Sequence, residues 1–282
     1  MTGPQAARLP GDRLHLQHGP IDLVISVDGP GREAAFHAAA RRFATVLEEL
    51  AAELPHLRLP VPSPLPGGST ARRMHRAVTP HASTFVTPMA AVAGGVADEI
   101  LAAMTAVPGL TRAVVNNGGD IAFHLAPGEA ATARIAGLDC TDLGQVRLAA
   151  SDPIRGLATS GQGGRSHSLG IADSVTALAT TAAEADVAAT LIANAVDLPG
   201  HPAISRAPAQ SLDPDSDLGT RPVVTAVGPL TPDEVVTALK RGLAAANAMR
   251  KHGLIAGAAL TLGGQTFTAL PTEADQPLLT ET

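Results

Sequence analysis

The residues with the clearest chemical potential form a glycine turn, Asn116-Asn117-Gly118-Gly119-Asp120, between two expected strands. Glycine has no side chain to shield its backbone N–H groups, so a ligand can approach them closely. The turn is therefore a candidate cradle for a phosphate or a pyrophosphate. The same residues also fit a tight structural turn in which Asn and Asp cap their own backbone. The stretch alone does not decide between the two interpretations.

A second glycine-rich segment follows a strand expected at 155–158. It runs from Thr159 to Arg165 and combines two hydroxyl groups, three glycines and one guanidinium group. Backbone dipoles and Arg165 together can bind a phosphate. Thr159, Ser160, Gly161 and Arg165 are thus candidate ligand contacts, with a mobile hairpin loop as the alternative.

Asp186 and Thr190 lie four residues apart on an expected helix, so their side chains project from one face. A carboxylate and a hydroxyl, with a backbone carbonyl nearby, are oxygen ligands that suit Mg²⁺. The alternative is an acidic residue near a helix N-terminus that stabilises the helix dipole. For the bare pair, the spacing favours this alternative.

The histidines do not form a recognisable metal or hydrolase motif. Ten are scattered along the chain without HExxH spacing, and no GxSxG elbow is present, so zinc and serine hydrolases lack their defining pattern. His75, His81 and His167 remain individual candidates for acid–base chemistry, each with an ordinary surface or buried structural role as the alternative. Cys140 is the only cysteine, which excludes an intramolecular disulfide and a cysteine zinc cluster.

Hydrophobic periodicity predicts the elements that must position these residues. Apolar residues at three- and four-residue spacing predict an amphipathic helix over 33–54. Thr87-Pro88, Thr181 with Glu184, and Thr231 with Glu234 have the chemistry of helix starts. The helices they open are expected to reach Met104, about Val196 and about Gly253. Strands are expected at 13–16, 21–27, 112–115, 121–125, 133–136, 145–149, 155–158, 254–262 and 265–270.

The order of these elements indicates an α+β fold with mixed or antiparallel sheets and packed helices. Strands and helices alternate irregularly, and hairpins are expected at both ends of the chain. No GxGxxG follows the first strand, so a Rossmann fold fails its first requirement. The Pro- and Gly-rich stretch 60–69 is a connection, too short to mark a domain boundary. We expect one domain over 1–282.

Composition narrows the classes of partner. The formal net charge is −6 and the chain has no Trp or Tyr, so it lacks the basic surface and stacking platforms of nucleic-acid-binding proteins. No apolar run approaches the ~18 residues of a membrane span, and the first eleven residues lack a signal-peptide pattern. We therefore expect no nucleic acid and no membrane partner, and a cytoplasmic location.

Four motifs in order resemble the motif series of the ApbE-like superfamily. They are VNNGGD at 115–120, ATSG at 158–161, DSVT at 173–176 and ADVAATL at 185–191. The segments RMHRAV, FVTPMAAVAGGVADEI and SGQGGRSHSLGIADSV are similar to an uncharacterised bacterial and archaeal branch of that superfamily. The resemblance covers a core of about 19–270, which leaves tails that we expect to be flexible.

The resemblance implies a ligand and a metal. Characterised ApbE proteins are Mg²⁺-dependent flavin transferases that split FAD and attach FMN to a threonine of an acceptor protein, whereas related members bind or hydrolyse FAD. Their metal site falls on Asp186, the Ala189 carbonyl and Thr190. Their glycine motif falls on Gly118, Gly119 and Asp120, and their flavin-contacting loop on Thr159, Ser160 and Gly161.

One departure from the family pattern bears on catalysis. Transferases carry His-x-x-Asp-Pro-x-Thr-Gly before the SVT segment, and here that place holds His167 to Asp173 without the Pro and the Thr-Gly. Three hypotheses stay open: an enzyme that acts on FAD, a flavin- or nucleotide-binding protein without transfer activity, and an enzyme for another small anionic ligand. For the first, Asp120, His167 and Asp173 are the proton-transfer candidates. A homodimer is the default oligomer.

Overall fold

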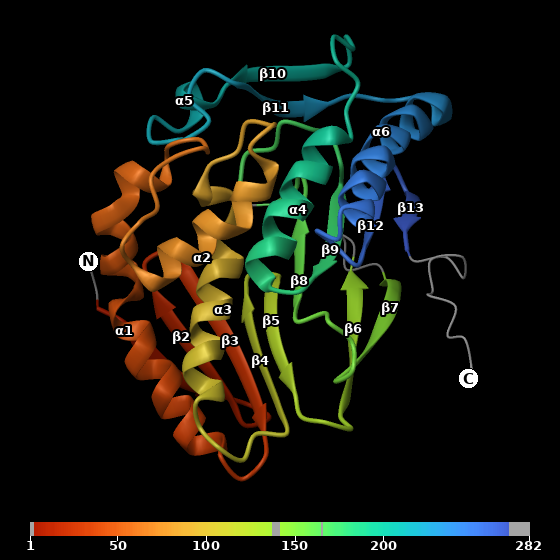
Figure 1. The fold of residues 1–282 in the computed structure, drawn as a ribbon. Coiled ribbons are helices and arrows are strands. Elements are labelled where there is room, and N and C mark those ends of the chain that lie inside the picture. Colours follow the sequence, from red (N-terminus) through yellow and green to blue (C-terminus); the bar gives the residue numbers. More distant parts are fainter. Residues whose placement is uncertain (1–2, 137–141, 165, 271–282) are drawn as a thin grey trace.

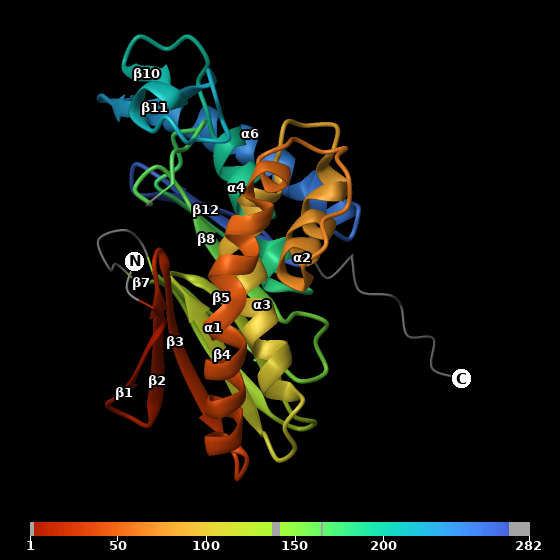
Figure 2. The same ribbon diagram turned by 90° about the vertical axis from the view of Figure 1, so that its left-hand side faces the viewer.

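The computed structural model, which describes residues 3–136, 142–164 and 166–270, is built on one nine-stranded sheet. Helices are layered on one face of this sheet (Figures 1 and 2). Its strand order is β1-β2-β3-β4-β5-β8-β9-β12-β13, and each of these neighbours pairs antiparallel. The predicted α+β class with antiparallel strands is confirmed. The strands of the sheet are β1 (Gln5–Leu9), β2 (Arg13–His18), β3 (Ile21–Asp28), β4 (Arg112–Asn117), β5 (Asp120–Leu125), β8 (Gly156–Ser160), β9 (Ser174–Ala179), β12 (Gly257–Leu262) and β13 (Gln265–Ala269).

The helices follow the expected starts closely. α1 (Arg32–Leu57) and α4 (Ala182–Ala195) match the predicted ranges, and a full capping box between Thr231 and Glu234 opens α6 (Pro232–Lys251). The helix expected from Pro88 is split, because its first turn is the 3₁₀ helix η2 (Pro88–Ala91) and the α-helix α3 (Val92–Thr105) begins only afterwards. The remaining helices are α2 (Ser69–Val78), η1 (Thr79–His81) and the single turn α5 (Ala209–Leu212).

Two small hairpins lie outside the large sheet. β6 (Ala130–Ala136) with β7 (Asp142–Ala149) were predicted as strands, whereas β10 (Ile204–Pro208) with β11 (Pro222–Val227) were not. A separate apolar cluster joins Phe123, Leu157 and Leu178 of the sheet to Leu148 of β7. The β6–β7 hairpin therefore covers part of the sheet face opposite the helices, as Figure 2 shows.

The N-terminal residues belong to the fold. β2 contains the strand predicted at 13–16 and pairs with β3, and β1 pairs with β2, so β1 extends the sheet into residues that were expected to form a flexible tail. Residues 271–282 lie outside the described part of the chain.

A buried glutamate ties the first three helices together. Glu99 of α3 is 7% exposed and accepts hydrogen bonds from Arg42 of α1 at 2.8 Å, Arg73 of α2 at 2.7 Å and Ser69 at 2.6 Å. These donors lower the pKa of Glu99 although burial, the largest single influence, raises it. The carboxylate is thus satisfied, and the three helices are held in one layer.

α3 and α4 cross in direct backbone contact at Gly94. A methyl group added at Gly94 would collide with the carbonyl of Ala182, and the neighbouring Gly95 faces Met74 of α2. The absence of side chains at Gly94 and Gly95 therefore permits this close packing of the helices. Both helices begin beside this crossing.

The crossing can be tested by adding one methyl group. We expect Gly94→Ala to lower the free energy of unfolding by about 1–3 kcal/mol, because the helices must separate. Helix propensity alone predicts the opposite sign, about 1 kcal/mol in favour of alanine. Urea denaturation measures the difference, with Gly67→Ala as control, since a methyl group there meets only a side-chain oxygen of Glu53 at 3.7 Å. A Gly94→Ala protein as stable as the wild type would contradict a tight crossing.

Candidate functional site

Both glycine segments lie at the same end of neighbouring strands in the large sheet. In the antiparallel register, Asn117 faces Asp120 across the β4–β5 turn, and β8 runs past that turn to end at Ser160. Ser160 pairs with Val175, close to the start of β9. The structure therefore brings together two segments that are about 40 positions apart in the sequence, which the sequence patterns alone did not show.

The β4–β5 turn has a geometry that requires glycine. Gly118 and Gly119 have φ of 66° and 112°, and a side chain on Gly119 would meet open space, so conformation and not crowding selects glycine there. Asn116 accepts a hydrogen bond from the Gly119 N–H at 2.8 Å. This bond is the self-capping expected of a structural turn, and it occupies one N–H of the proposed cradle.

The turn is fastened to the start of α3. The buried Asn117 donates from its amide to the Ala93 carbonyl at 3.0 Å. The next residue, Gly94, donates its N–H to the Asp186 carboxylate of α4, also at 3.0 Å. The glycine turn, the N-terminus of α3 and Asp186 therefore form one connected unit.

Asp98 makes the reciprocal connection. Its carboxylate lies on α3 and accepts the Ala182 and Ala183 N–H groups of α4 at 3.0 and 2.9 Å. Each helix thus supplies the carboxylate that caps the other, which satisfies donors that a helix N-terminus leaves free. Burial nevertheless raises the pKa of Asp98 to about 6, with the two N–H groups acting in the opposite direction. The sequence patterns did not indicate Asp98, which is followed directly by a second acidic residue, Glu99.

Asp186 and Asp120 act on each other electrostatically. The pKa of Asp186 is raised well above its usual range, first by burial of the carboxyl group and then by the negative charge of Asp120. The Gly94 and Ala93 N–H groups oppose this shift, and the charge of Asp98 adds to it. Both Asp186 and Asp120 keep partial solvent exposure, so the pair is reachable from outside.

The other two predicted metal ligands differ in their placement. Thr190 lies one turn after Asp186 on α4 and is partly exposed. Ala189 is fully buried within α4, where a backbone carbonyl accepts the helix's own hydrogen bond. Among the described residues, no group of three or more His, Cys, Asp or Glu side chains could hold a metal ion.

The second glycine segment is shaped by its neighbours. Gly161 is required because a methyl group there would collide with the Asp173 carbonyl, and Thr159 shares a hydrogen bond of 2.9 Å with Thr176 on β9. Ser160 ends β8 and is partly exposed. Arg165 lies outside the described residues.

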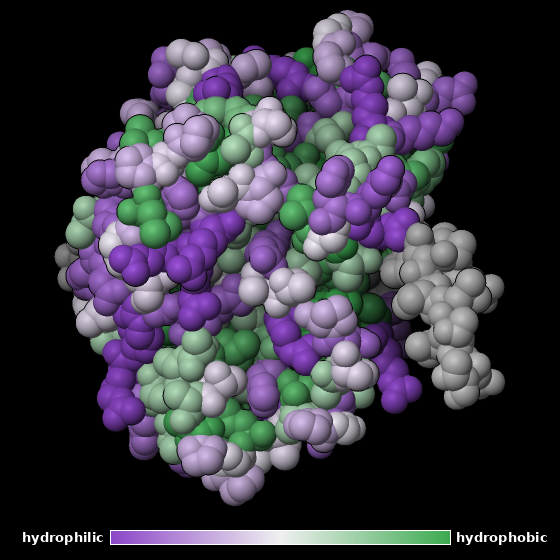
Figure 3. All heavy atoms as spheres, viewed as in Figure 1, coloured by the Kyte–Doolittle hydropathy of each residue, from purple (hydrophilic) through white to green (hydrophobic). Residues whose placement is uncertain are grey.

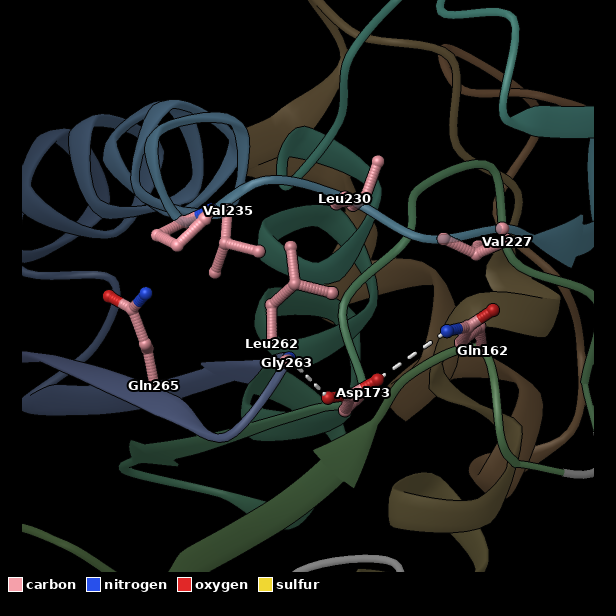
Figure 4. Close-up of a pocket in the computed structure, with 10 residues that line it drawn as sticks. Gln162, Asp173, Val227, Leu230, Val235, Leu262, Gly263 and Gln265 are labelled. Atoms are coloured by element: carbon pink, nitrogen blue, oxygen red, sulfur yellow. Dashed lines mark hydrogen bonds between the residues drawn. The ribbon is translucent and has the colours of Figure 1, made fainter.

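Asp173 is engaged inside the protein. It accepts the Gly263 N–H of the β12–β13 turn at 2.7 Å and the Gln162 amide at 3.5 Å (Figure 4). These residues line a cavity of about 290 Å³ beside the start of α6. The geometry indicates that Asp173 positions two loops. His167 is exposed.

Similarity to known proteins identifies the family of this chain. A family model described as "AbpE bacteria" matches residues 6–268. The chain belongs to this AbpE bacteria family. The ApbE-like membership predicted from the four ordered motifs is thereby confirmed.

The chain is also similar to individual proteins. The AbpE-family chain is 31% identical over 180 residues to a UPF0280 protein of Methanopyrus kandleri, covering 61% of this chain and 69% of the relative. It is 37% identical over 126 residues to a UPF0280 protein of Methanococcoides burtonii, covering 44% of this chain and about half, 52%, of the relative. The solved flavinyl transferase ApbE of Pseudomonas stutzeri, apo form, is similar over 95% of both chains with 13% identity and a TM-score of 0.41. The flavin transferase ApbE from Vibrio cholerae is similar over 94% of this chain and 97% of its own, with 12% identity and a TM-score of 0.39.

Within the described ranges, no helix combines the length and the apolar character needed to cross a membrane.

The reciprocal caps have a measurable pH signature. Because the pKa of Asp98 in the folded protein is about 6, above its usual value of 3.8, the folded state holds a proton more tightly between about pH 4 and 6. The stability contributed by this group is present below pH 4 and is lost as the pH rises through 6. We expect the wild type minus Asp98→Asn difference in unfolding free energy to fall across this window, by on the order of 3 kcal/mol.

Urea denaturation at several pH values checks this expectation. Asp233→Asn is the control, because Asp233 is exposed in the first turn of α6. A wild type minus Asp98→Asn difference that stays constant between pH 4 and 7 would contradict the assigned shift.

Proposed function

We propose that this protein is a Mg²⁺-dependent enzyme that acts on FAD, with Asp186, Asp120 and Thr190 around the cation. The observation that carries the proposal is the electrostatic coupling of Asp186 and Asp120 in a partly accessible, desolvated place. A carboxyl group whose pKa is raised by burial and by a second carboxylate becomes stable as an anion when a cation lies beside it. Family membership and the ordered motifs supply the flavin part of the proposal.

The donor set fits magnesium better than a metal that needs a full protein cage. Mg²⁺ prefers oxygen ligands, keeps several waters, and is bound through one or two carboxylates together with substrate phosphates. Two carboxylates and one hydroxyl meet this description, and they agree with the lack of a larger cluster among the described residues. When bound, the ion would neutralise pyrophosphate charge and polarise a phosphoryl oxygen. Ala189 is not included, because its carbonyl lies inside α4.

The protein's own residues would place the pyrophosphate. The Gly118-Gly119 turn is held against α3 by Asn117, and Ser160 and Thr159 close the same edge of the sheet. Backbone dipoles at such a turn favour an anion. Cleavage would break the P–O–P bridge of FAD to give AMP, with FMN passed to water or to a threonine hydroxyl of an acceptor protein. His167 is the group proposed to move the proton, because Asp120 is assigned to the cation, while Asp173 positions loops.

The alternative is a flavin-binding protein that leaves FAD intact. It is favoured by the replaced transferase element, since the stretch 167–173 lacks the Pro and the Thr-Gly of that pattern. The exposed His167 and the internally bonded Asp173 also fit this alternative.

The two functions separate in one experiment. Purified protein is incubated with FAD with and without Mg²⁺, and the nucleotides are separated by chromatography. We expect FMN and AMP only with Mg²⁺, and at least a 100-fold lower rate in Asp186→Asn, because the cation loses a charged ligand. Asp233→Asn, exposed on α6, should keep the wild-type rate. Tight binding with FAD returned intact would establish the alternative, and full activity in Asp186→Asn would refute the cation site.

Cation binding also has a readout independent of turnover. We expect Mg²⁺ to raise the melting temperature of the wild type, since a ligand that binds only the folded state stabilises it. Differential scanning fluorimetry should show no such rise in Asp186→Asn. An equal rise in both proteins would place the ion elsewhere.

A further inference from the structure

A larger cavity lies on the helical face of the molecule, apart from the glycine turns. It has a volume of about 740 Å³ and is enclosed by the η1 segment, the C-terminal half of α4 and the end of α6. Figure 3 shows this face with hydrophobic side chains surfacing among hydrophilic ones. Cavities of roughly 300–1,000 Å³ accommodate drug-sized ligands. The cavity is therefore large enough for a small molecule. None of the residues proposed for FAD cleavage lines it.

The wall of this cavity carries no charged carboxylate or cation. Of the fourteen described residues that line it, none is Asp, Glu, Lys or Arg. Leu191, Met249 and Leu254 provide apolar surface, and Phe85 provides an aromatic ring over which the Arg221 guanidinium lies at 3.1 Å. Because most of the lining is apolar or neutral, it favours an uncharged ligand.

His81 supplies the observation that points to a ligand. It lines the cavity, is only 8% exposed, and neither ring nitrogen makes a hydrogen bond within the described part of the chain. Burial lowers its pKa, with the distant negative charge of Glu184 opposing the shift. A neutral imidazole has one N–H donor and one acceptor nitrogen. The ring nitrogens are not among the buried atoms left without a partner, so they are accessible, and a ligand in the cavity can bond them.

Asn194 adds orientation at the same wall. Its side-chain oxygen accepts the Leu169 N–H at 3.0 Å, which fixes the amide of a residue that lines the cavity. Asn194 and His81 come from α4 and η1, so a ligand bonded to both would bridge two elements. Leu191 follows Asp186 by five residues, which places the two about 140° apart around α4. Asn194, by contrast, lies four residues after Thr190 and shares its face of α4, so the cavity and the proposed cation site are neighbours along this helix.

We propose that this cavity is a binding site for an uncharged, flat heteroaromatic molecule with adjacent hydrogen-bond donor and acceptor groups. The ring system packs among Leu191, Met249 and Phe85, and its polar edge bonds His81 and the Asn194 amide. The site does not depend on the proposed flavin chemistry, because none of its residues contributes to the cation or glycine-turn contacts.

Quinazolin-4-one is a suitable probe, since it is neutral and bicyclic and has a carbonyl beside an N–H. Saturation-transfer NMR on the full chain measures its binding to the wild type and to three variants. Ala245→Leu fills the cavity, and His81→Phe keeps a ring but removes both hydrogen-bonding nitrogens. Ala244→Leu is the matched control, because Ala244 is an exposed neighbour on α6 that does not line the cavity.

The expected result is binding to the wild type and Ala244→Leu, with at least tenfold weaker binding to Ala245→Leu and His81→Phe. Melting curves of all four proteins identify any variant that is unfolded. If either Ala245→Leu or His81→Phe is unfolded, the other is compared with the wild type. Equal binding to all folded variants would overturn the proposal, as would no binding to the wild type at millimolar probe. Loss of FAD cleavage together with retained probe binding would reject only the proposed function.

Discussion

The close crossing of α3 and α4, in which each helix caps the other with a carboxylate, is the constraint on which the rest of the site depends. Two helix N-termini brought this near each other bring their positive dipole ends together. Asp98 meets the first N–H groups of α4, and Asp186 meets the Gly94 N–H of α3. Only glycine at position 94 permits the approach. The crossing then fixes Ala93 where Asn117 of the glycine turn can bond it.

The same arrangement explains why Asp186 is suited to more than a structural role. Backbone N–H groups at a helix start stabilise a capping carboxylate and lower its pKa. In Asp186 burial and the charge of Asp120 outweigh those N–H groups, so its pKa rises. Asp98 is raised as well, but its carboxylate is nearly inaccessible and both oxygens meet backbone donors. Asp186 is partly accessible and is repelled by the negative charge of Asp120. An external cation would therefore lower the electrostatic cost of ionising Asp186.

Local patterns in the sequence predicted what local physics determines. The helices α1, α4 and α6 and the two-glycine β4–β5 hairpin follow from periodicity, capping residues and turn chemistry within a few positions of each other. α2, β9 and the β10–β11 hairpin were missed, because their residues find partners far away, as when Val224 donates to the Ser168 carbonyl. The Asp186 and Thr190 pair was recognisable from its spacing. Its neighbours Asp98 and Gly94 were not, since a cap supplied by another helix has no signature in the sequence near it.

α4 connects the proposed cation site and the proposed heteroaromatic site while keeping their chemistry apart. Asp186 interacts with Asp120 near the start of the helix, and Leu191 and Asn194 line the cavity beside His81 further along it. The first site carries two carboxylates and the second carries none, so the two sites favour different ligands. Both still depend on where the crossing at Gly94 places α4. A change that disturbs both sites therefore reports on the position of the helix, whereas a change confined to one reports on the residues that line it.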